Sequence, residues 1–297
     1  MDLRNIQTFI RAAELGSFTK VANELGYVQS TVTMQMQQLE RELGFPLFDR
    51  IGKKISLTAL GLEFLGYAYR IERTMMEASN LGKETTDIKG TLRVGVLESL
   101  LFGNMLQLLP RFKDKYINLD LQLKMGHASE LLQQLKQNQL DIVYLSAGLN
   151  TDPELHCCYR RREKLVFVCS PEHPIANRKD ITIEELLKYD FVVTERTGIC
   201  YGRLQSLAQR YNAMLHVAVE VDSTVAIAAL VQMNMVLAFL PEYSVQKKLE
   251  SGDLIRVDVD IEPQIYYSQI LYHNSRWKSP FMVGLIEEIK AFHPEVE

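Results

Sequence analysis

The sequence predicts an α/β protein in which a small helical module and a long connecting helix precede a larger α/β domain of two lobes. Three observations lead to this prediction. Apolar residues recur at helical spacing up to residue 43, a second and longer helical pattern covers about 58–81, and strand and helix patterns alternate from residue 90 onward. We therefore expect three parts, at residues 1–60, 61–89 and 90–297.

The first part begins with two short amphipathic helices. The first helical pattern starts at Leu3, and Gly16 ends it. Ser17 is a suitable N-cap for a second helix over Phe18–Leu25, because its hydroxyl can accept a hydrogen bond from a free backbone N–H. The next three residues, 26–28, are enough only for a tight turn between two helices.

A third helix is predicted from Gln29 or Ser30 to Leu43, with one apolar and one polar face. Two helices joined by a short turn form a helix-turn-helix, whose second helix can enter the major groove of DNA. Hydroxyl and amide groups there can hydrogen-bond base edges, and a Met or Thr methyl can touch thymine. The predicted DNA-binding residues on this helix are Gln29, Ser30, Thr31, Thr33, Met34 and Gln37.

A basic hairpin is expected over residues 45–58. Arg50, Lys53 and Lys54 lie at or near its tip, where cations suit contacts with phosphates or the minor groove. Periodicity alone favours a different interpretation, a three-helix bundle with a solvated polar face. Charge does not decide the matter, because residues 1–60 hold seven Lys or Arg against six Asp or Glu.

A set of specific residues favours the DNA-binding interpretation. They are Gly16-Ser17-Phe18-Thr19, Val21-Ala22, Leu25, Gln29, Gln38-Leu39-Glu40, Leu43-Gly44, Pro46-Leu47-Phe48, Arg50, Leu57-Thr58 and Gly61. Over the first sixty or so residues, without a gap, this run resembles the N-terminal signature of LysR-type transcriptional regulators. The resemblance implies a winged helix-turn-helix that binds double-stranded promoter DNA and acts on the transcription machinery.

The chain departs from the family pattern at the start of the third helix. The family usually has Ser, Gln and Pro where this chain has Val28, Gln29 and Ser30, and it often has Arg where this chain has Met34. Loss of a serine cap and of a cationic phosphate contact implies an altered operator preference. The scaffold positions are intact, so the departures do not affect the predicted DNA binding.

Thr58 is suited to cap a long helix whose apolar stripe continues to about Leu81. We expect no partner for this stripe within its own small domain, so it would pair with the same helix of another subunit. The alternative is that it packs on the downstream domain, which Gly82 and the polar run 83–89, interpreted as a hinge, disfavour. In the resembled family this helix mediates dimerisation and dimers form tetramers, which implies a homodimer or homotetramer here.

From residue 90 the pattern alternates between strands and helices, as in parallel sheets with right-handed crossovers. The predicted strands lie at 91–97, 119–124, 141–145, 164–169, 191–194, 217–221, 236–240, 254–259 and 269–272. The predicted helices lie at 99–115, 129–138, 201–211, 224–233 and 281–292. We expect lobe I at about 90–163 and 269–297, and lobe II at about 164–268. Pattern and length resemble the periplasmic-binding-protein-like effector domain of the same family.

A ligand of such a domain is expected beyond the carboxyl ends of the strands, where helix N-termini present free N–H groups. The resembled family binds its effector at these turns, between the lobes, and small anions such as carboxylates are typical there. The candidate residues are Ser99, Leu100, His127, Ala128, Ser129, Thr197, Gly198, Ile199, Cys200 and Thr224. The alternative is that Ser99, Ser129 and Thr224 are only N-caps, and that His127 is an ordinary surface histidine.

Cys200 is also a candidate redox sensor. A helix N-terminus and the neighbouring Arg196 and Arg203 are both expected to lower its thiol pKa. A peroxide-sensing branch of the resembled family carries a reactive cysteine in a comparable position, with a resolving cysteine after it. This chain has no cysteine between 201 and 297, so redox sensing is the lesser alternative. The adjacent Cys157 and Cys158 suit neither a zinc site nor an ordinary local disulfide.

Composition narrows the classes of protein. A net charge of −4 argues against bulk packaging of nucleic acid, and apolar stretches such as 225–231 are far below the ~18 residues that span a bilayer. The start of the chain has no apolar signal core, and four cysteines lack the spacing of a disulfide framework. These features predict a cytoplasmic protein without membrane contact.

No catalytic motif, phosphate loop or metal-binding motif is present in the sequence. We expect no enzyme, no metal and no cofactor apart from a small-molecule effector. The rival from another class is a cytosolic solute-binding module that uses its first helices only for oligomerisation. Such a module would lack the salt-dependent DNA binding of a regulator.

Overall fold

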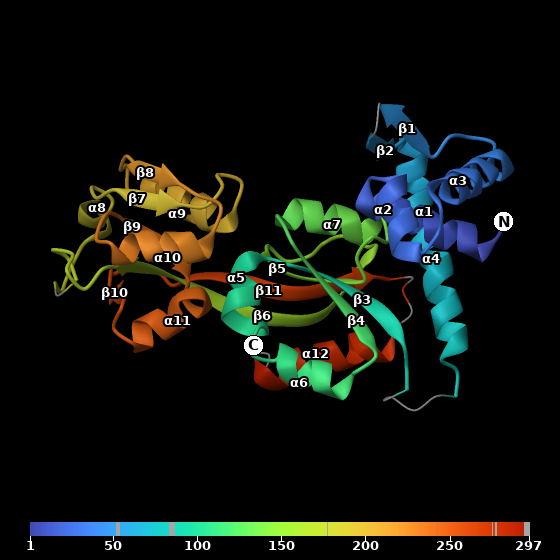
Figure 1. Cartoon of the computed structure of the whole chain (residues 1–297). Helices are drawn as coiled ribbons and strands as arrows, with labels where there is room; N and C mark the ends of the chain where they lie inside the picture. Colours follow the sequence, from blue (N-terminus) through green and yellow to red (C-terminus); the bar gives the residue numbers. More distant parts are fainter. Residues whose placement is uncertain (52–53, 83–86, 177, 275, 277, 294–297) are drawn as a thin grey trace. The chain divides into compact units, whose positions relative to one another are not determined.

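The computed structural model describes residues 1–51, 54–82, 87–176, 178–274, 276 and 278–293 (Figure 1). They group into two compact units, each described by itself below. The first unit holds Met1–Arg93, Tyr116–Gln122 and Leu132–Asp141, and the second holds Val94–Lys115, Leu123–Leu131 and Ile142–Glu297. None of the described helices is long and apolar enough to cross a membrane.

The first unit begins with three helices and a two-stranded hairpin, as predicted. The elements are α1 (Leu3–Leu15), α2 (Phe18–Leu25), α3 (Gln29–Leu43), β1 (Phe48–Ile51) and β2 (Lys54–Leu57). Gly16, Gly26 and Gly44 end the three helices in the left-handed conformation, at φ 60°, 70° and 81°. The predicted cap is present, since Ser17 accepts a hydrogen bond from Lys20 N at 3.4 Å.

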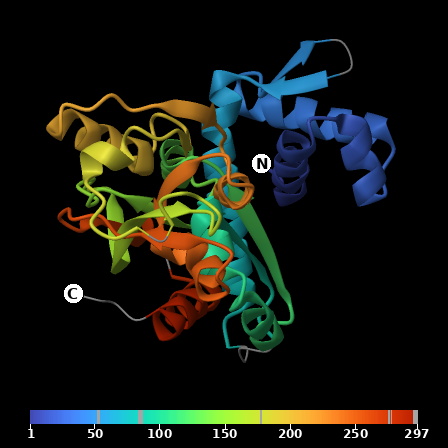
Figure 2. The same ribbon diagram turned by 90° about the vertical axis from the view of Figure 1, so that its left-hand side faces the viewer.

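The core of the bundle is aromatic. The Phe9 ring lies 5.4 Å from that of Phe48 and 5.2 Å from that of Phe64, centroid to centroid. The Phe18 ring meets Phe48 edge-on at 5.4 Å. These contacts tie the hairpin to the helices, and Figure 2 shows the hairpin in light blue beside them. Glu40 adds a polar link, because its Oε1 accepts from Leu47 N at 2.8 Å.

The connecting helix is α4 (Ala59–Ser79), and its first half packs on the bundle. Thr58 Oγ1 accepts from Gly61 N at 2.8 Å, as the predicted cap requires. Phe64, Leu65, Ala68 and Tyr69 are buried in the bundle core. The expectation that this helix lacks a partner in its own small domain is therefore wrong, because these side chains cover α1.

The second half of α4 contacts residues downstream of the expected hinge. Arg93 pairs with Glu72 at 3.1 Å and lies over the Tyr69 ring at 4.3 Å from its centroid. Asp141 accepts from the backbone N of Arg93 at 2.6 Å. The helix α4 therefore also packs on the downstream segment, which is the alternative that the sequence disfavoured. The contact consists of charged side chains from α4 and from the start of β3 that pair with one another. Residues 83–86 of the predicted hinge lie outside the described residues.

The larger domain contains one mixed sheet with the order β4-β3-β5-β11-β6-β9-β7-β8, and β10 pairs with β6. The strands are β3 (Gly90–Val96), β4 (Leu119–Met125), β5 (Ile142–Ala147), β6 (Leu155–Cys169), β7 (Phe191–Val193), β8 (Val217–Glu220), β9 (Leu237–Pro241), β10 (Ile255–Val257) and β11 (Gln264–His273). Parallel pairing of β3 with β5, and of β7 with β8 and β9, agrees with the prediction of parallel sheets.

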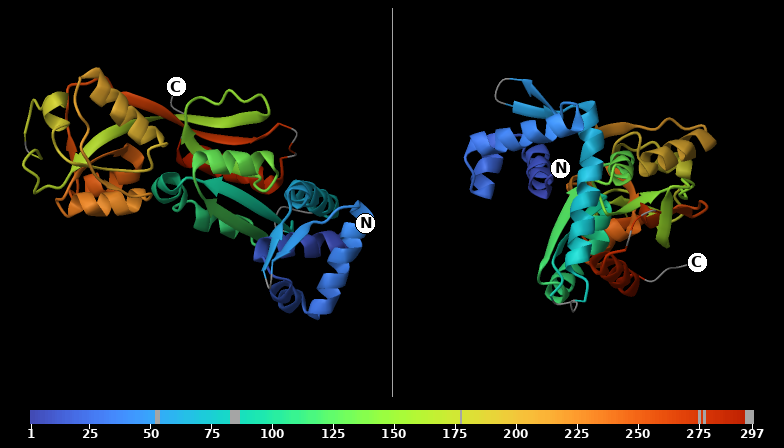
Figure 3. Two further views of the ribbon diagram at one scale, coloured as in Figure 1. Left: turned by 90° about the horizontal axis from the view of Figure 1, so that it is seen from above. Right: turned by 90° about the vertical axis from the view of Figure 1, so that its right-hand side faces the viewer.

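Two long antiparallel strands, β6 and β11, connect the two halves of this sheet. Their register runs from Leu155 opposite His273 to Leu165 opposite Gln264, and Figure 3 shows them side by side. The sequence predicted only residues 164–169 of β6, because the charged run 160–164 hides its alternation. Cross-strand contacts compensate for these charges: Arg160 lies over the Tyr267 ring at 5.4 Å.

The helices of the larger domain are α5 (Glu98–Leu100), a π-helical turn (Leu101–Met105), α6 (Leu109–Lys115), α7 (Ala128–Lys136), α8 (Ile183–Leu186), α9 (Ile199–Arg210), α10 (Thr224–Gln232), α11 (Glu242–Glu250) and α12 (Pro280–Phe292). The helix predicted at 99–115 is therefore three pieces, and α8 and α11 were not predicted. Ser99, Ser129 and Thr224 are not N-caps. Ser99 and Ser129 are the second residues of α5 and α7, and Thr224 is the first residue of α10.

The sheet of the second lobe is covered on both faces, which explains its apolar strands. Alternate residues of β6 face opposite sides: Phe167 joins the core beneath α9, and Val166 and Val168 join the core beneath α10. The Phe167 ring stacks on Phe239 of β9 at 4.4 Å between centroids. The turns that follow β7 and β8 at this sheet carry the candidate ligand residues described next.

Candidate functional site

The first candidate surface is the polar face of α3. Val32, Met36 and Leu39 are fully buried and hold the helix in the bundle. Ser30, Met34 and Gln37 are exposed on another face of the helix, and Met34 retains 58% of its accessible surface. The spacing of buried and exposed positions is what a helix needs to present one face to a groove.

Two predicted DNA-binding residues of α3, Gln29 and Thr33, are hydrogen-bonded to each other. The Thr33 hydroxyl donates to the backbone carbonyl of Gln29 at 3.0 Å, and the Gln29 Nε2 donates to Thr33 Oγ1 at 3.5 Å. Thr31 and Thr33 are only half-exposed, so they contribute less surface than the sequence suggested. Gln29 is exposed, and its contact with Thr33 limits the directions in which its amide can point.

The start of α3 shows the effect of the departure from the family pattern. Val28 occupies the N-cap position in extended conformation and provides no side-chain hydrogen bond. Instead of a side chain, the Val28 backbone carbonyl accepts from Thr31 N at 2.9 Å in this first turn. In the hairpin, Arg50 pairs opposite Ile55 through the backbone, and Lys54 begins β2. Lys53 lies outside the described residues.

The second candidate site lies at the turns after the parallel strands, and it contains a contact that the sequence did not indicate. Glu98 begins α5 after β3, and its carboxylate accepts from Ser223 Oγ at 2.9 Å. It also accepts from Thr224 N at 2.6 Å and from Thr224 Oγ1 at 2.9 Å. The actual N-cap of α10 is Ser223, whose hydroxyl accepts from Ala226 N at 3.1 Å.

Ser99 takes part in a second contact between distant segments. Its hydroxyl and the Tyr243 hydroxyl are 3.1 Å apart, and the Tyr243 hydroxyl is also 3.2 Å from Ser146 Oγ. Burial raises the pKa of Tyr243, so its phenol stays neutral and able to donate. Tyr243 lies on α11, a helix that the sequence did not predict, and for this reason its role was missed.

His127 lies between two carboxylates. Its Nδ1 is 3.4 Å from Glu195 Oε1 and its Nε2 is 3.2 Å from Asp222 Oδ2. Burial, together with the nearby Asp222 carboxylate, raises the pKa of Glu195. The three ligand atoms lie within 4.8 Å of one another, so these side chains could hold a divalent cation, and a protonated His127 would balance the same charges.

The remaining predicted residues surround the start of α9. Gly198 is its N-cap, and a Cβ there would lie 3.0 Å from Glu195 Oε1. Thr197 and Ser129 are exposed, Ala128 and Ile199 are half-buried, and Leu100 is fully buried. The structure thus links Ser99, His127 and Thr224 to polar partners and leaves Leu100 as a core residue.

Cys200 does not have the predicted low pKa. Burial and the nearby Glu195 carboxylate raise the pKa of its thiol to about 12. The arginines that were expected to lower it have other partners. Arg196 pairs with Glu220 at 3.0 Å, and Arg203 donates to the carbonyl of Ile265 at 3.5 Å.

We predict that Cys200 reacts slowly with iodoacetamide in the native protein. With a pKa near 12, only about one thiol in 10⁴ to 10⁵ is ionised at pH 7.5. Mass spectrometry of the alkylated protein should find modification of Cys200 at native pH to be much slower than in urea. Rapid native alkylation, or formation of a sulfenic acid with dilute peroxide, would restore the redox interpretation.

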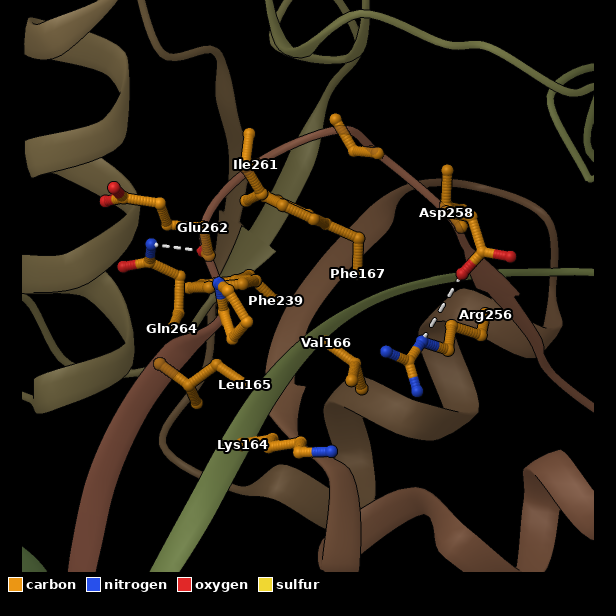
Figure 4. A pocket seen from close by; sticks show the side chains of 13 residues that line it. Lys164, Leu165, Val166, Phe167, Phe239, Arg256, Asp258, Ile261, Glu262 and Gln264 are labelled. Atoms are coloured by element: carbon orange, nitrogen blue, oxygen red, sulfur yellow. Dashed lines mark hydrogen bonds and ion pairs between the residues drawn. The ribbon is translucent and has the colours of Figure 1, made fainter.

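Two hollows in the described part of the second unit contain none of the predicted effector residues. One, of about 140 Å³, lies between β6, β9 and the start of β11, and Figure 4 shows Phe167, Arg256 and Asp258 around it. The other, of about 670 Å³, is lined by residues that include Arg161, Glu242 and His293. At the predicted site itself, the structure shows direct side-chain contacts between segments.

Two protein families together match nearly the whole chain. Residues 3–62 match the family described as bacterial regulatory helix-turn-helix protein, lysR family. Residues 86–293 match the LysR substrate binding domain. The Bacillus subtilis protein YwqM, an uncharacterized HTH-type transcriptional regulator, is 28% identical over 288 residues, which is 97% of this chain and 98% of that protein. CmpR of Synechocystis, an HTH-type transcriptional activator, is 26% identical and covers 92% of this chain and 90% of its own.

Solved structures show the same fold. A full-length OxyR from Pseudomonas aeruginosa superposes with a TM-score of 0.76 at 18% identity, covering 99% of this chain and 96% of that chain. Full-length CbnR, complexed with its target DNA, superposes with a TM-score of 0.66 at 20% identity, covering 98% of this chain and 99% of that chain. The similarity extends over both the helix-turn-helix and the two-lobed domain.

Proposed function

Because the chain belongs to the LysR family of transcriptional regulators, we propose that it binds a dyad-related promoter site as a homo-oligomer and responds to an effector held between its lobes. As a member of this family it is a DNA-binding regulator with an effector-binding domain, and it is not an enzyme. The resemblance in its first sixty residues is thereby confirmed. A cytoplasmic location and contact with the transcription machinery remain predictions.

The observation that carries the DNA-binding proposal is the division of α3 into a buried and an exposed face. Val32, Met36 and Leu39 are fully covered, so the helix cannot rotate without breaking the bundle core. We assign Gln29, Ser30, Thr31, Thr33, Met34 and Gln37 to the major groove and Arg50, Lys53 and Lys54 to the DNA backbone. Contacts with bases determine sequence specificity, whereas contacts with phosphates position the protein on DNA of any sequence.

Self-association is proposed through the exposed part of α4. Leu60, Leu62, Tyr67 and Met75 keep 38–49% of their accessible surface, although the other side of the helix is buried. Exposed apolar side chains along one helix are typical of a subunit interface. We propose domains at 1–60, 61–89 and 90–297, a homodimer through α4, and a homotetramer as the larger assembly.

The effector is proposed to bind at the turns that carry Ser99, His127, Gly198, Cys200 and Thr224. Supporting this, contacts at these turns join residues of the expected lobes I and II, so a ligand there would change how the lobes meet. The ligand must bind one arrangement of the lobes better than the other to alter regulation. The prediction that the effector is an anion has no support at the N-terminus of α10, because the Glu98 carboxylate already accepts the hydrogen bonds there.

We predict that Gln29→Ala and Lys54→Ala weaken DNA binding in different ways. Loss of the Gln29 amide should cost about 1–3 kcal/mol for the specific operator and little for random DNA. Loss of the Lys54 charge should weaken binding to all sequences alike and reduce the slope of log K against log salt by about one unit. Titrations with operator and scrambled duplexes at several salt concentrations measure both effects.

Gln205→Ala, at an exposed glutamine on α9, is a control that should leave both the specificity and the salt slope unchanged. Equal loss on operator and scrambled DNA for Gln29→Ala would remove α3 from base recognition. DNA binding that is absent at every salt concentration would favour the solute-binding alternative instead.

A further inference from the structure

The N-terminus of α10 already holds a carboxylate, and that carboxylate belongs to the chain itself. Glu98 receives three hydrogen bonds there: from Ser223 Oγ at 2.9 Å, from Thr224 N at 2.6 Å and from Thr224 Oγ1 at 2.9 Å. Both carboxylate oxygens are used. The two segments are 125 residues apart in the sequence, so only the folded lobes bring them together.

The arrangement of donors is that of a site for a small anion. The first N–H groups of a helix carry positive potential, and hydrogen bonds to a charged acceptor are the strong ones. Ser223 Oγ accepts from Ala226 N at 3.1 Å, which leaves its proton for Glu98 Oε1. Main chain and both hydroxyls therefore all donate toward one point, which Glu98 occupies.

The neighbouring charges discourage a second anion. Asp222 immediately precedes Ser223, and Asp222 and Glu195 flank His127. Within the described residues, His127 is the basic side chain that contacts these two carboxylates. An effector carboxylate arriving at α10 would have to displace Glu98 and approach two further acids.

We propose that Glu98 is a specificity-determining residue that fills the carboxylate position at the α10 N-terminus and makes the native protein reject effectors that need this position. The inference rests on the proposed effector site between the lobes. It also gives Glu98 a conformational role, since its carboxylate joins α5 to α10 in the way a bound carboxylate ligand would.

Chemical rescue tests this proposal. Glu98→Ala removes the carboxylate and leaves the donors of Ser223 and Thr224 without their acceptor. We expect a lower melting temperature for Glu98→Ala, and a saturable rise of that temperature on addition of sodium acetate. Acetamide, which has the same shape without the charge, and sodium chloride at equal ionic strength should give no comparable rise.

The matched control is Glu287→Ala, which removes the same carboxylate from an exposed position on α12. Neither this variant nor the native protein should respond to acetate beyond the chloride baseline. Thr224→Ala combined with Glu98→Ala should weaken the acetate response, because one of the three donors is lost. If Glu98→Ala does not fold, Glu98→Ser also removes the carboxylate and replaces glutamate with a smaller polar side chain.

Equal responses of Glu98→Ala, Glu287→Ala and the native protein to acetate would overturn the proposal. So would tight binding of a carboxylate effector to the native protein that depends on Thr224. Operator binding is measured on the same samples. A variant that binds operator but ignores acetate contradicts the role of Glu98 alone, whereas a native protein that never binds DNA contradicts the proposed regulator.

Discussion

Phe9→Ala should destabilise the N-terminal bundle by about 3–5 kcal/mol, the cost of removing a buried aromatic ring from a packed core. The Phe9 side chain is fully buried and contacts the rings of Phe48 in the hairpin and Phe64 in α4. Its loss leaves a cavity at the point where three elements meet. Hydrogen exchange of the α1 and α3 peptides should speed up accordingly, and operator binding should weaken with it.

Phe102→Ala is the matched control, because the Phe102 side chain keeps 47% of its accessible surface. We expect that variant to change exchange in α1 and α3 little. If Phe9→Ala left exchange in these helices at the native rate, the aromatic cluster would not be the element that stabilises the bundle. The result would also weaken the argument that the bundle core fixes the exposed face of α3.

Local signals in the sequence were sufficient to predict the elements of the bundle. Gly16, Gly26 and Gly44 end helices at positions that require positive φ, and Ser17 and Thr58 cap the helices that follow them. These devices act within a few residues, so one sequence suffices to recognise them. The parallel direction of β3 and β5 was predictable for a similar reason, because strands that alternate with helices favour a parallel sheet. The order β4-β3-β5 was not predictable in this way, because β4 lies between β3 and β5 in the chain but not in the sheet.

Contacts between distant segments could not be predicted in the same way. Glu98 follows a strand as many surface acids do, and nothing near it indicates Thr224 as its partner. The pKa of Cys200 was predicted with the wrong sign, because the sequence shows neither the burial of its thiol nor the Glu195 carboxylate near it. It also does not show that Arg196 and Arg203 have other partners. In both cases the decisive effect depends on the three-dimensional positions of the groups.

The packing of α4 is a third case of this kind. Its apolar stripe indicated a helix with an uncovered face, but not which face the bundle covers. Phe64, Leu65 and Ala68 turned out to be core residues, and Glu72 pairs with Arg93. The exposed set that remains, Leu60, Leu62, Tyr67 and Met75, was not distinguishable from the buried set by hydropathy alone.

Gly61→Ala should be the most disruptive single methyl addition in the first unit. A Cβ at Gly61 would lie 2.1 Å from the carbonyl oxygen of Leu47 and 3.0 Å from its carbonyl carbon. Both are backbone atoms of the segment that leads into β1, so α4 or the hairpin must move. Overpacking of this kind costs typically about 1–3 kcal/mol and occasionally more, and a clash with main chain belongs at the upper end.

The displacement should affect function as well as stability, because Glu40 fixes the same segment to α3 through Leu47 N at 2.8 Å. Operator affinity should fall, and thermal melting should show a lower transition for the N-terminal bundle. Gly202→Ala on α9 is the control: no atom lies within 4 Å of an added Cβ there, and alanine favours the helix by up to about 1 kcal/mol. Similar melting temperatures for the two variants would show that the close approach of α4 to Leu47 is not required.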